Sequence, residues 1–111
     1  LRESVAKYSV VATPADIQAV SDDWLFSITS EFRKEVSPLD KKMQGKIMAA
    51  IAEICRNPQK PRGDTVKPLS GELAGKWRFR LGDYRLVYLP DVRKHTVHLL
   101  AIRPRGSVYD E

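Results

Sequence analysis

Apolar residues recur along this chain at two spacings, one typical of strands and one typical of helices. Residues 24–29 place their larger apolar side chains at every second position, namely at Trp24, Phe26 and Ile28. This period of two indicates a strand with one buried face. Residues 30–36 instead place Phe32 and Val36 four positions apart, which predicts a short helix directly after the strand.

The strongest helical pattern begins at residue 39. Its apolar residues form one stripe over about four turns; they are Leu39, Met43, Ile47, Ala50, Ile51, Ile54 and Cys55. Asp40 near the start and Arg56 near the end suit the helix macrodipole, and Asn57-Pro58 ends the helix. Residues 57–75 are rich in Pro and Gly and show no period, so we expect a long irregular connection there, of a kind that is often functional.

The two ends of the chain add one helix start and one strand. Residues 12–20 begin with Thr13 as a helix N-cap and Pro14 at the first helical position. We therefore expect residues 1–23 to be a partly helical N-terminal extension and residues 24–111 to be the main domain. Residues 95–102 predict a last strand, and an antiparallel course would carry Arg103 back beside the strands that precede it.

The stretch KWRFRLGDYRLVY, residues 76–88, alternates apolar and basic residues on both sides of a Gly-Asp pair. A two-residue turn at Gly82-Asp83 pairs Leu81 with Tyr84, because Gly at the first position adopts a positive φ at little cost. Counting outward from the turn puts Arg78, Arg80 and Arg85 on one face. The other face then consists of Trp77, Phe79, Leu81, Tyr84, Leu86 and Tyr88. Like charges opposite each other destabilise a sheet, so the cluster favours an anion site; a solvated face is the alternative.

Charge is distributed unevenly along the chain. The net charge is +5, but residues 56–105 hold twelve Lys and Arg against four Asp and Glu, while the remainder holds seven against ten. A basic lobe attracts polyanions such as nucleic acid, although many soluble domains are mildly basic. No stretch approaches the roughly 20 apolar residues of a membrane span. The start of the chain lacks the apolar run of a secretory signal, and the single cysteine, Cys55, fits a small core residue, so we expect a cytoplasmic protein.

The residue inventory disfavours several kinds of site. His95 and His98 are three apart on a predicted strand, and no cluster of Cys or carboxylates completes a metal site, so we expect no metal and no cofactor. His98 fits a strand residue that makes a hydrogen bond better than a catalyst. No Gly-rich phosphate loop, Ser/His/Asp arrangement or Cys/His pair is apparent. Arginine is the remaining candidate for a functional group. Its planar guanidinium suits phosphate oxygens, and its charge stabilises a pentacovalent transition state. The same groups also bind RNA without cleaving it.

The chain contains, in this order, a strand, two helices, the segment GDTVKPLSGELAGKWRFRLGDYRLVY, a further strand and the segment IRPRGSVY. This order resembles the RelE/ParE superfamily of bacterial toxin–antitoxin toxins, the RelE branch in particular, over residues 24–109. The resemblance implies an α+β, RelE-like fold in which a small twisted antiparallel sheet, the hairpin plus flanking strands, packs against two helices. It also implies a ribosome-dependent endoribonuclease that needs no metal. In the reaction that the resemblance implies, the 2′-hydroxyl of one nucleotide attacks the adjacent phosphate and leaves a 2′,3′-cyclic phosphate and a 5′-hydroxyl.

Position by position, the resemblance implies five catalytic residues, namely Arg78, Arg80, Arg85, Arg103 and Tyr109. Arg78 and Arg80 replace lysines of well-studied members, and since arginine does not deprotonate, Arg80 is an electrostatic group and no general base. Arg85 is implied to bind phosphate and Arg103 to protonate or stabilise the leaving group. Tyr109 is implied to stack on a base or abstract a proton, with packing on the sheet as the alternative. Additional RNA contacts are expected at Arg105, Lys76, Lys67, Arg62 and Lys60, although a solvated loop explains the last three equally well.

The partners implied by the resemblance are a cognate antitoxin and the 70S ribosome with its mRNA. Operator DNA is expected only through the antitoxin, and a membrane is not expected. One alternative is a ParE-like toxin that inhibits DNA gyrase or another topoisomerase by binding, without nuclease chemistry. Such toxins tend to lack the complete set of basic residues plus tyrosine, so its presence here favours the nuclease. An inactive partner-binding module, or a corepressor on DNA, is a third possibility.

Overall fold

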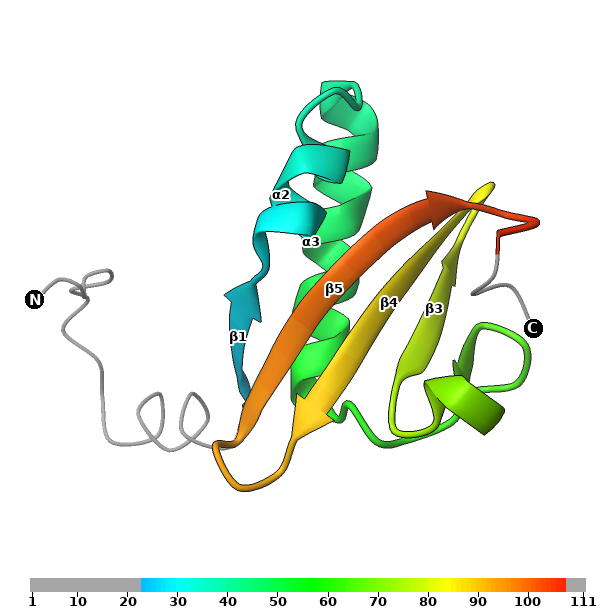
Figure 1. Cartoon of the computed structure of the whole chain (residues 1–111). Coiled ribbons are helices and arrows are strands. Elements are labelled where there is room, and N and C mark those ends of the chain that lie inside the picture. The colour runs from blue at the N-terminus through cyan, green and yellow to red at the C-terminus, as the bar shows by residue number, and fades with distance from the viewer. Residues whose placement is uncertain (1–22, 108–111) are drawn as a thin grey trace, which may run out of the picture.

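The structure, a computed structural model, describes residues 23–107, which form one five-stranded sheet and two α-helices (Figure 1). In chain order the elements are β1 (Leu25–Ile28), α2 (Ser30–Val36), α3 (Lys41–Arg56), β2 (Val66–Pro68), the short 3-10 helix η1 (Gly71–Leu73), β3 (Trp77–Leu81), β4 (Tyr84–Asp91) and β5 (Thr96–Pro104). The α+β class is thereby confirmed. The helix expected at residues 12–20 and Tyr109 both lie outside the described residues.

The strands lie in the order β1-β5-β4-β3-β2. Three of the four neighbouring pairs are antiparallel, as expected, but β1 runs parallel to β5, with Leu25 beside Thr96 and Ile28 beside Leu99. The sheet is therefore mixed, which differs from the antiparallel sheet expected. Of the alternating apolar residues, Trp24 packs against the core, but Phe26 and Ile28 of β1 are 44% and 40% exposed, so the buried face predicted for this strand is largely absent. The alternation also contains no information about the direction in which the strand runs.

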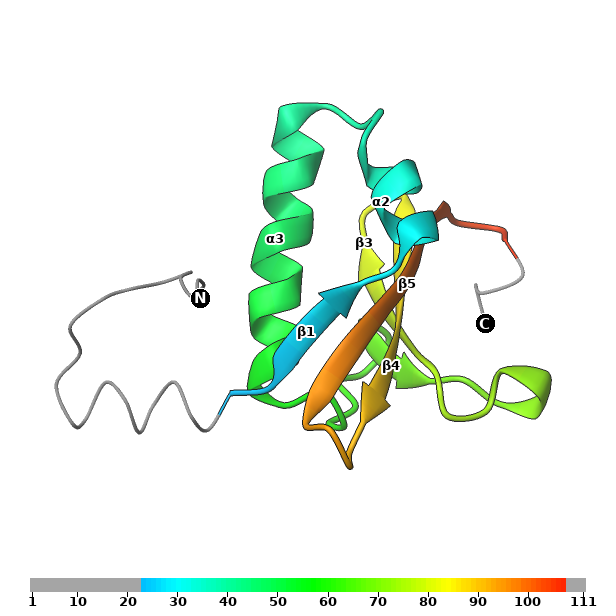
Figure 2. The same ribbon diagram turned by 60° about the vertical axis from the view of Figure 1, so that its left-hand side comes forward.

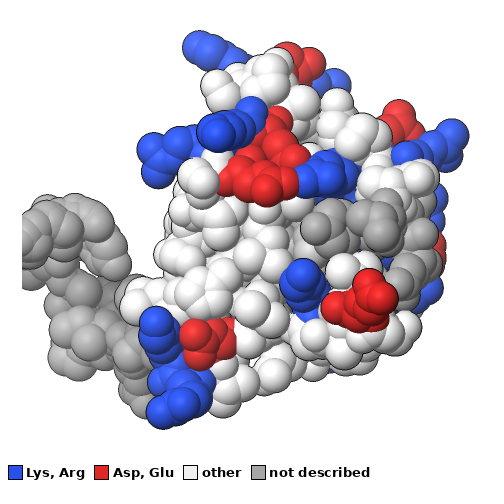
Figure 3. Space-filling model, viewed as in Figure 1, with Lys and Arg blue, Asp and Glu red and all other residues white. Residues whose placement is uncertain are grey.

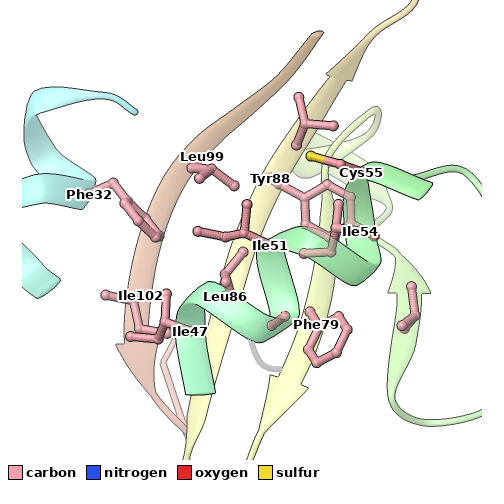
Figure 4. Packing of buried hydrophobic residues seen from close by; sticks show 13 residues of the cluster. Phe32, Ile47, Ile51, Ile54, Cys55, Phe79, Leu86, Tyr88, Leu99 and Ile102 are labelled. Atoms are coloured by element: carbon pink, nitrogen blue, oxygen red, sulfur yellow. The ribbon is translucent and has the colours of Figure 1, made fainter. Parts of the chain in front are cut away.

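The two helices match the sequence pattern closely. α3 begins after Asp40, whose side chain accepts a hydrogen bond of 2.7 Å from the backbone N–H of Met43. Its apolar stripe packs on the sheet and, with Phe32 of α2, forms the core that Figure 4 shows. Cys55 belongs to this core and is 6% exposed, so its prediction as a small core residue is confirmed.

The β3–β4 hairpin has the predicted register. Leu81 pairs with Tyr84 and Arg80 with Arg85 around a turn in which Gly82 has a φ of 61°. The six apolar residues of the hairpin all face α3 and belong to the main core or pack against it. The basic residues therefore lie on the opposite face of the sheet, which α3 does not cover (Figure 2). We call it the open face.

The connection expected to be irregular contains two short elements. Within residues 57–75, β2 pairs with β3 at the edge of the sheet, and η1 follows it. Leu69 and Leu73 of this segment pack against Val87 and Ala101, so they cover part of the open face. A strand of three residues that includes Pro68 is too short to show a period of two, and it forms because β3 offers an edge. None of the helices within residues 23–107 combines the length and apolar content that crossing a bilayer requires.

Candidate nucleic-acid interface

Three arginines form one row across the open face, next to the β3–β4 turn. Arg80 of β3 is the cross-strand partner of Arg85 of β4, and Arg85 is the partner of Arg103 of β5. Residues paired directly across neighbouring strands project from the same face, with their Cβ atoms about 5 Å apart. The expectation that β5 returns Arg103 to the hairpin is thus confirmed. We call these three residues the arginine row.

Further basic residues border the arginine row. Arg78 lies two residues from Arg80 along β3. The cross-strand partner of Arg78 on β2 is Lys67. The backbone N–H of Arg105 donates to the carbonyl of Asp83 in the hairpin turn at 2.8 Å, which places Arg105 beside the row. Lys76 directly precedes β3 and is half-buried.

Lys60 and Arg62 lie elsewhere. Both line a pocket between the C-terminal end of α3 and the core face of the sheet, together with Phe79 and Tyr88. Arg62 forms an ion pair with Glu53 of α3, and its guanidinium carbon lies 5.9 Å from the centre of the Phe79 ring. The structure therefore separates these two predicted RNA contacts from the arginine row by the thickness of the sheet.

Asp64 anchors the two arginines of β3. The almost fully buried Arg78 donates to the backbone carbonyl of Asp64 at 3.1 Å and to its carboxylate at 3.4 Å, while the exposed Arg80 donates to the same carboxylate at 2.6 Å. The hydrogen bond from Arg80, and then the bond and charge of Lys67, lower the pKa of Asp64 below its usual value. These contacts fix the segment before β2 against β3.

Arg85 is held by the turn that it follows. Its Nη1 donates to the carbonyl oxygens of Gly82 at 3.0 Å and of Tyr84 at 3.1 Å, and the residue is only 5% exposed. A guanidinium that binds the turn carbonyls has a fixed orientation. Arg85 therefore places a positive charge at the centre of the row.

Arg103 is held by two carboxylates of α2. Its Nε donates to Glu35 and its Nη2 to Glu31, and the other oxygen of Glu35 accepts from the backbone N–H of Ile102 at 2.9 Å. Burial by itself lowers the pKa of Arg103, but the hydrogen bonds and charges of Glu35 and Glu31 outweigh it and raise that pKa. Figure 3 accordingly shows acidic side chains directly beside basic ones at the upper end of this face.

The arginines thus converge in their backbone positions, whereas their guanidinium groups rest on separate anchors. Sequence reasoning missed all three anchoring residues, Asp64, Glu31 and Glu35. Arg80 is 16 residues from Asp64, and Arg103 is 68 residues from Glu35 and 72 from Glu31. No local pattern relates residues that far apart, so only the register of the sheet and the docking of α2 reveal the contacts.

A second polar group on the open face was also missed. Ser27 Oγ lies 2.7 Å from His98 Nδ1, and His98 Nε2 lies 3.1 Å from an oxygen of Asp91, so that one chain of hydrogen bonds joins β1, β5 and β4. The prediction that His98 makes a strand hydrogen bond is confirmed, but the statement that no Ser/His/Asp arrangement is apparent is wrong. The bond from His98, then that from the Lys94 N–H, lowers the pKa of Asp91.

The Ser27–His98–Asp91 group lies away from the arginine row. His98 and Arg103 are five residues apart on β5, which is about 16 Å along a strand. The hydrogen bonds tie the edge strand β1 to the middle of the sheet. Within residues 23–107, no three His, Cys, Asp or Glu side chains gather as metal ligands would.

The residues of the sheet and the arginine row match a known family model. The model described as the ParE toxin of type II toxin–antitoxin systems, parDE, matches residues 26–109. The chain belongs to this family. It is therefore a member of the RelE/ParE superfamily, and the resemblance seen in the sequence motifs is confirmed.

Individual relatives are toxins of the RelE and YoeB types. Toxin YoeB of Streptomyces coelicolor is 44% identical over 52 residues, which are 46% of this chain and 61% of the YoeB chain. Toxin RelG of Mycobacterium tuberculosis is 36% identical over 73 residues, 61% of this chain and 79% of RelG. The solved toxin–antitoxin complex RelBE2 of M. tuberculosis matches with a TM-score of 0.64 at 28% identity, over 75% of this chain and 99% of that one. These relatives favour the RelE-like over the ParE-like toxin.

Proposed function

We propose that this toxin is an endoribonuclease that cleaves mRNA on the ribosome without a metal ion. The observation that supports the proposal most directly is the arginine row, because Arg80, Arg85 and Arg103 are direct cross-strand neighbours on the open face. Guanidinium groups at neighbouring positions are well suited to bind phosphate oxygens, once RNA displaces the exposed carboxylates of Asp64 and Glu31 that pair with Arg80 and Arg103. Membership of a toxin family whose relatives include RelG and YoeB supports the same chemistry.

In the proposed reaction, the 2′-hydroxyl oxygen attacks the adjacent phosphorus and the bond from phosphorus to the 5′-oxygen breaks. The proton of the 2′-hydroxyl passes to Tyr109 or to water. The leaving 5′-oxygen takes a proton from water, while Arg103, which does not deprotonate, stabilises its negative charge. Arg80, Arg85 and Arg103 stabilise the additional negative charge of the pentacovalent phosphorus. The almost fully buried Arg78 acts by anchoring Asp64, and through it Arg80, rather than by touching RNA.

Residues around the row extend the proposed RNA surface. Lys67, Lys76 and Arg105 border the row and are proposed to bind neighbouring phosphates, which is the common role of basic side chains at an RNA interface. Lys60 and Arg62 lie on the face covered by α3, and we propose that they contact ribosomal RNA separately from the substrate strand.

The proposed regulator is a cognate antitoxin. The neighbouring structure RelBE2 is a toxin–antitoxin complex, which supports a partner of this kind for the present chain. An antitoxin that covers the arginine row would block the RNA and neutralise the row at the same time. The toxin would then bind operator DNA only indirectly, through the antitoxin.

The test is to incubate the purified full chain with mRNA-programmed ribosomes and to map the ends of the mRNA. We expect cuts in the decoding site, with the 2′,3′-cyclic phosphate ends that attack by the 2′-hydroxyl leaves. Arg85→Ala and Arg103→Ala are each expected to reduce cleavage on the order of 100-fold, as the loss of one transition-state donor does in other enzymes. Arg93→Ala is the matched control, because it removes the same charge from the β4–β5 loop at the other end of the sheet.

Two results would contradict the proposal. If Arg93→Ala reduced cleavage as strongly as Arg85→Ala, only the total charge would matter and the row would have no special role. If the mRNA stayed intact while DNA gyrase lost its supercoiling activity, the protein would act as a ParE-like toxin.

A further inference from the structure

The side of α2 that faces β5 presents two carboxylates to one arginine. Glu31 and Glu35 are four residues apart and therefore lie on the same side of the helix. Both bind Arg103, but at different nitrogens: Glu35 accepts from Nε and Glu31 from Nη2. The two carboxylates thus bind neighbouring nitrogens along one edge of the same guanidinium group.

Glu35 is fixed at both of its oxygens. One oxygen binds Arg103, and the other accepts from the backbone N–H of Ile102 at 2.9 Å. The pairing of β1 with β5 ends at Leu99, so Ile102 lies beyond the last strand partner on that edge and Glu35 supplies an acceptor in its place. With a side chain only 22% exposed, Glu35 is part of the framework of the sheet.

Glu31 differs in each of these respects. Its side chain is 59% exposed, and it binds the outer nitrogen of Arg103. Exposed ion pairs of this kind contribute little to stability, because water already solvates both charges well. A phosphate that approaches Arg103 from solvent therefore displaces Glu31 far more readily than Glu35.

We infer that Glu35 is a positioning residue, which aims Arg103 along the open face, and that Glu31 is an internal competitor, which occupies the outer nitrogen of Arg103 until an RNA phosphate replaces it. The inference rests on the proposed function and adds two carboxylates to it. Removal of Glu31 should strengthen RNA binding, whereas removal of Glu35 should weaken catalysis and leave binding nearly unchanged.

The binding arm of the test uses a short 2′-O-methyl RNA oligonucleotide, which cannot be cleaved because its attacking hydroxyl is blocked. Fluorescence anisotropy at a series of salt concentrations compares the full-length wild type with Glu31→Gln and with Glu72→Gln. Glu72 is an exposed carboxyl of η1, so its variant controls for the change in net charge. We expect Glu31→Gln to bind about two- to fivefold more tightly. The slope of the logarithm of its binding constant against the logarithm of the salt concentration should become more negative by about 0.7. This is the value for one more neutralised phosphate of a single strand.

The catalytic arm measures cleavage on programmed ribosomes. We expect Glu35→Gln to lower the turnover number by on the order of tenfold, because a displaced catalytic group loses its alignment, with little change in affinity for the oligonucleotide. The glutamine retains an oxygen for the Ile102 N–H, so the fold should persist, and thermal unfolding checks that it does. In a ¹⁵N spectrum the Nε signal of Arg103 should shift in Glu35→Gln, and far less in Glu31→Gln.

The outcomes separate this inference from the proposed function. Equal affinities of Glu31→Gln and Glu72→Gln would overturn the role of Glu31, and a wild-type turnover number in Glu35→Gln would overturn that of Glu35. If the wild type bound the oligonucleotide but cut no mRNA, the nuclease proposal would fail alone, and the affinity and the Nε signal would still decide the inference. Absence of RNA binding by the wild type would overturn the role of Glu31.

Discussion

Substitution by methionine should have different effects at the two arginines of β3: at Arg78 it should lower stability, and at Arg80 it should lower activity. Arg78 has a side chain that is 2% exposed and a bond of 3.1 Å to the Asp64 carbonyl, whereas the side chain of Arg80 is 47% exposed. A hydrogen bond from a charged group contributes about 1.5–3 kcal/mol. Arg78→Met retains the apolar stem but loses this bond, so we expect the free energy of unfolding to fall by about 2 kcal/mol and Tm to fall by about 10 °C. Arg80→Met should lower Tm by less than about 3 °C, since an exposed ion pair contributes little.

Both variants should be followed by far-UV circular dichroism during thermal and urea unfolding, and by cleavage on programmed ribosomes. The expected pattern is a stable but inactive Arg80→Met and an unstable Arg78→Met that retains partial activity at low temperature. An Arg78→Met variant as stable as the wild type would refute the conclusion that Arg78 is a structural anchor. Equal destabilisation of the two variants would refute the distinction drawn between them.

Three other predictions concern single groups. Burial raises the pKa of the Cys55 thiol to about 11, so iodoacetamide should modify Cys55 only after unfolding, as mass spectrometry with and without urea will show. The folded-state pKa of Asp91 lies below its unfolded value of 3.8 because His98 donates to it. Its stabilising effect is therefore present above that value and lost as the pH falls through the folded pKa. Asp91→Asn should accordingly lower Tm near neutral pH, and the difference from the wild type should close in acid. Gly82→Ala should destabilise the hairpin by about 1 kcal/mol, because φ is 61° there, whereas Gly82→Asn should recover part of this loss, since Asn tolerates positive φ.

Local patterns in the sequence determined the elements and the faces of the hairpin. The α3 helix forms where its apolar stripe and the Asp40 cap predict it, and the alternation around Gly82-Asp83 specifies the pairing of Arg80 with Arg85. These features depend on residues that are close in the chain, where periods of two and of about four map directly onto geometry. The sorting of basic residues onto one face of the hairpin follows from the same periodicity.

Only the tertiary structure decided which groups the arginines contact. The parallel course of β1, the bonds from Arg103 to Glu31 and Glu35, and the Ser27–His98–Asp91 group each join segments about 70 residues apart. Periodicity reveals the face from which a side chain projects, but not the partner that it meets, because that partner depends on how separate elements dock. The chain thus encodes the pairing of Arg80 with Arg85 locally, whereas the place of Arg103 in the row and the anchors of all three arginines depend on the complete fold.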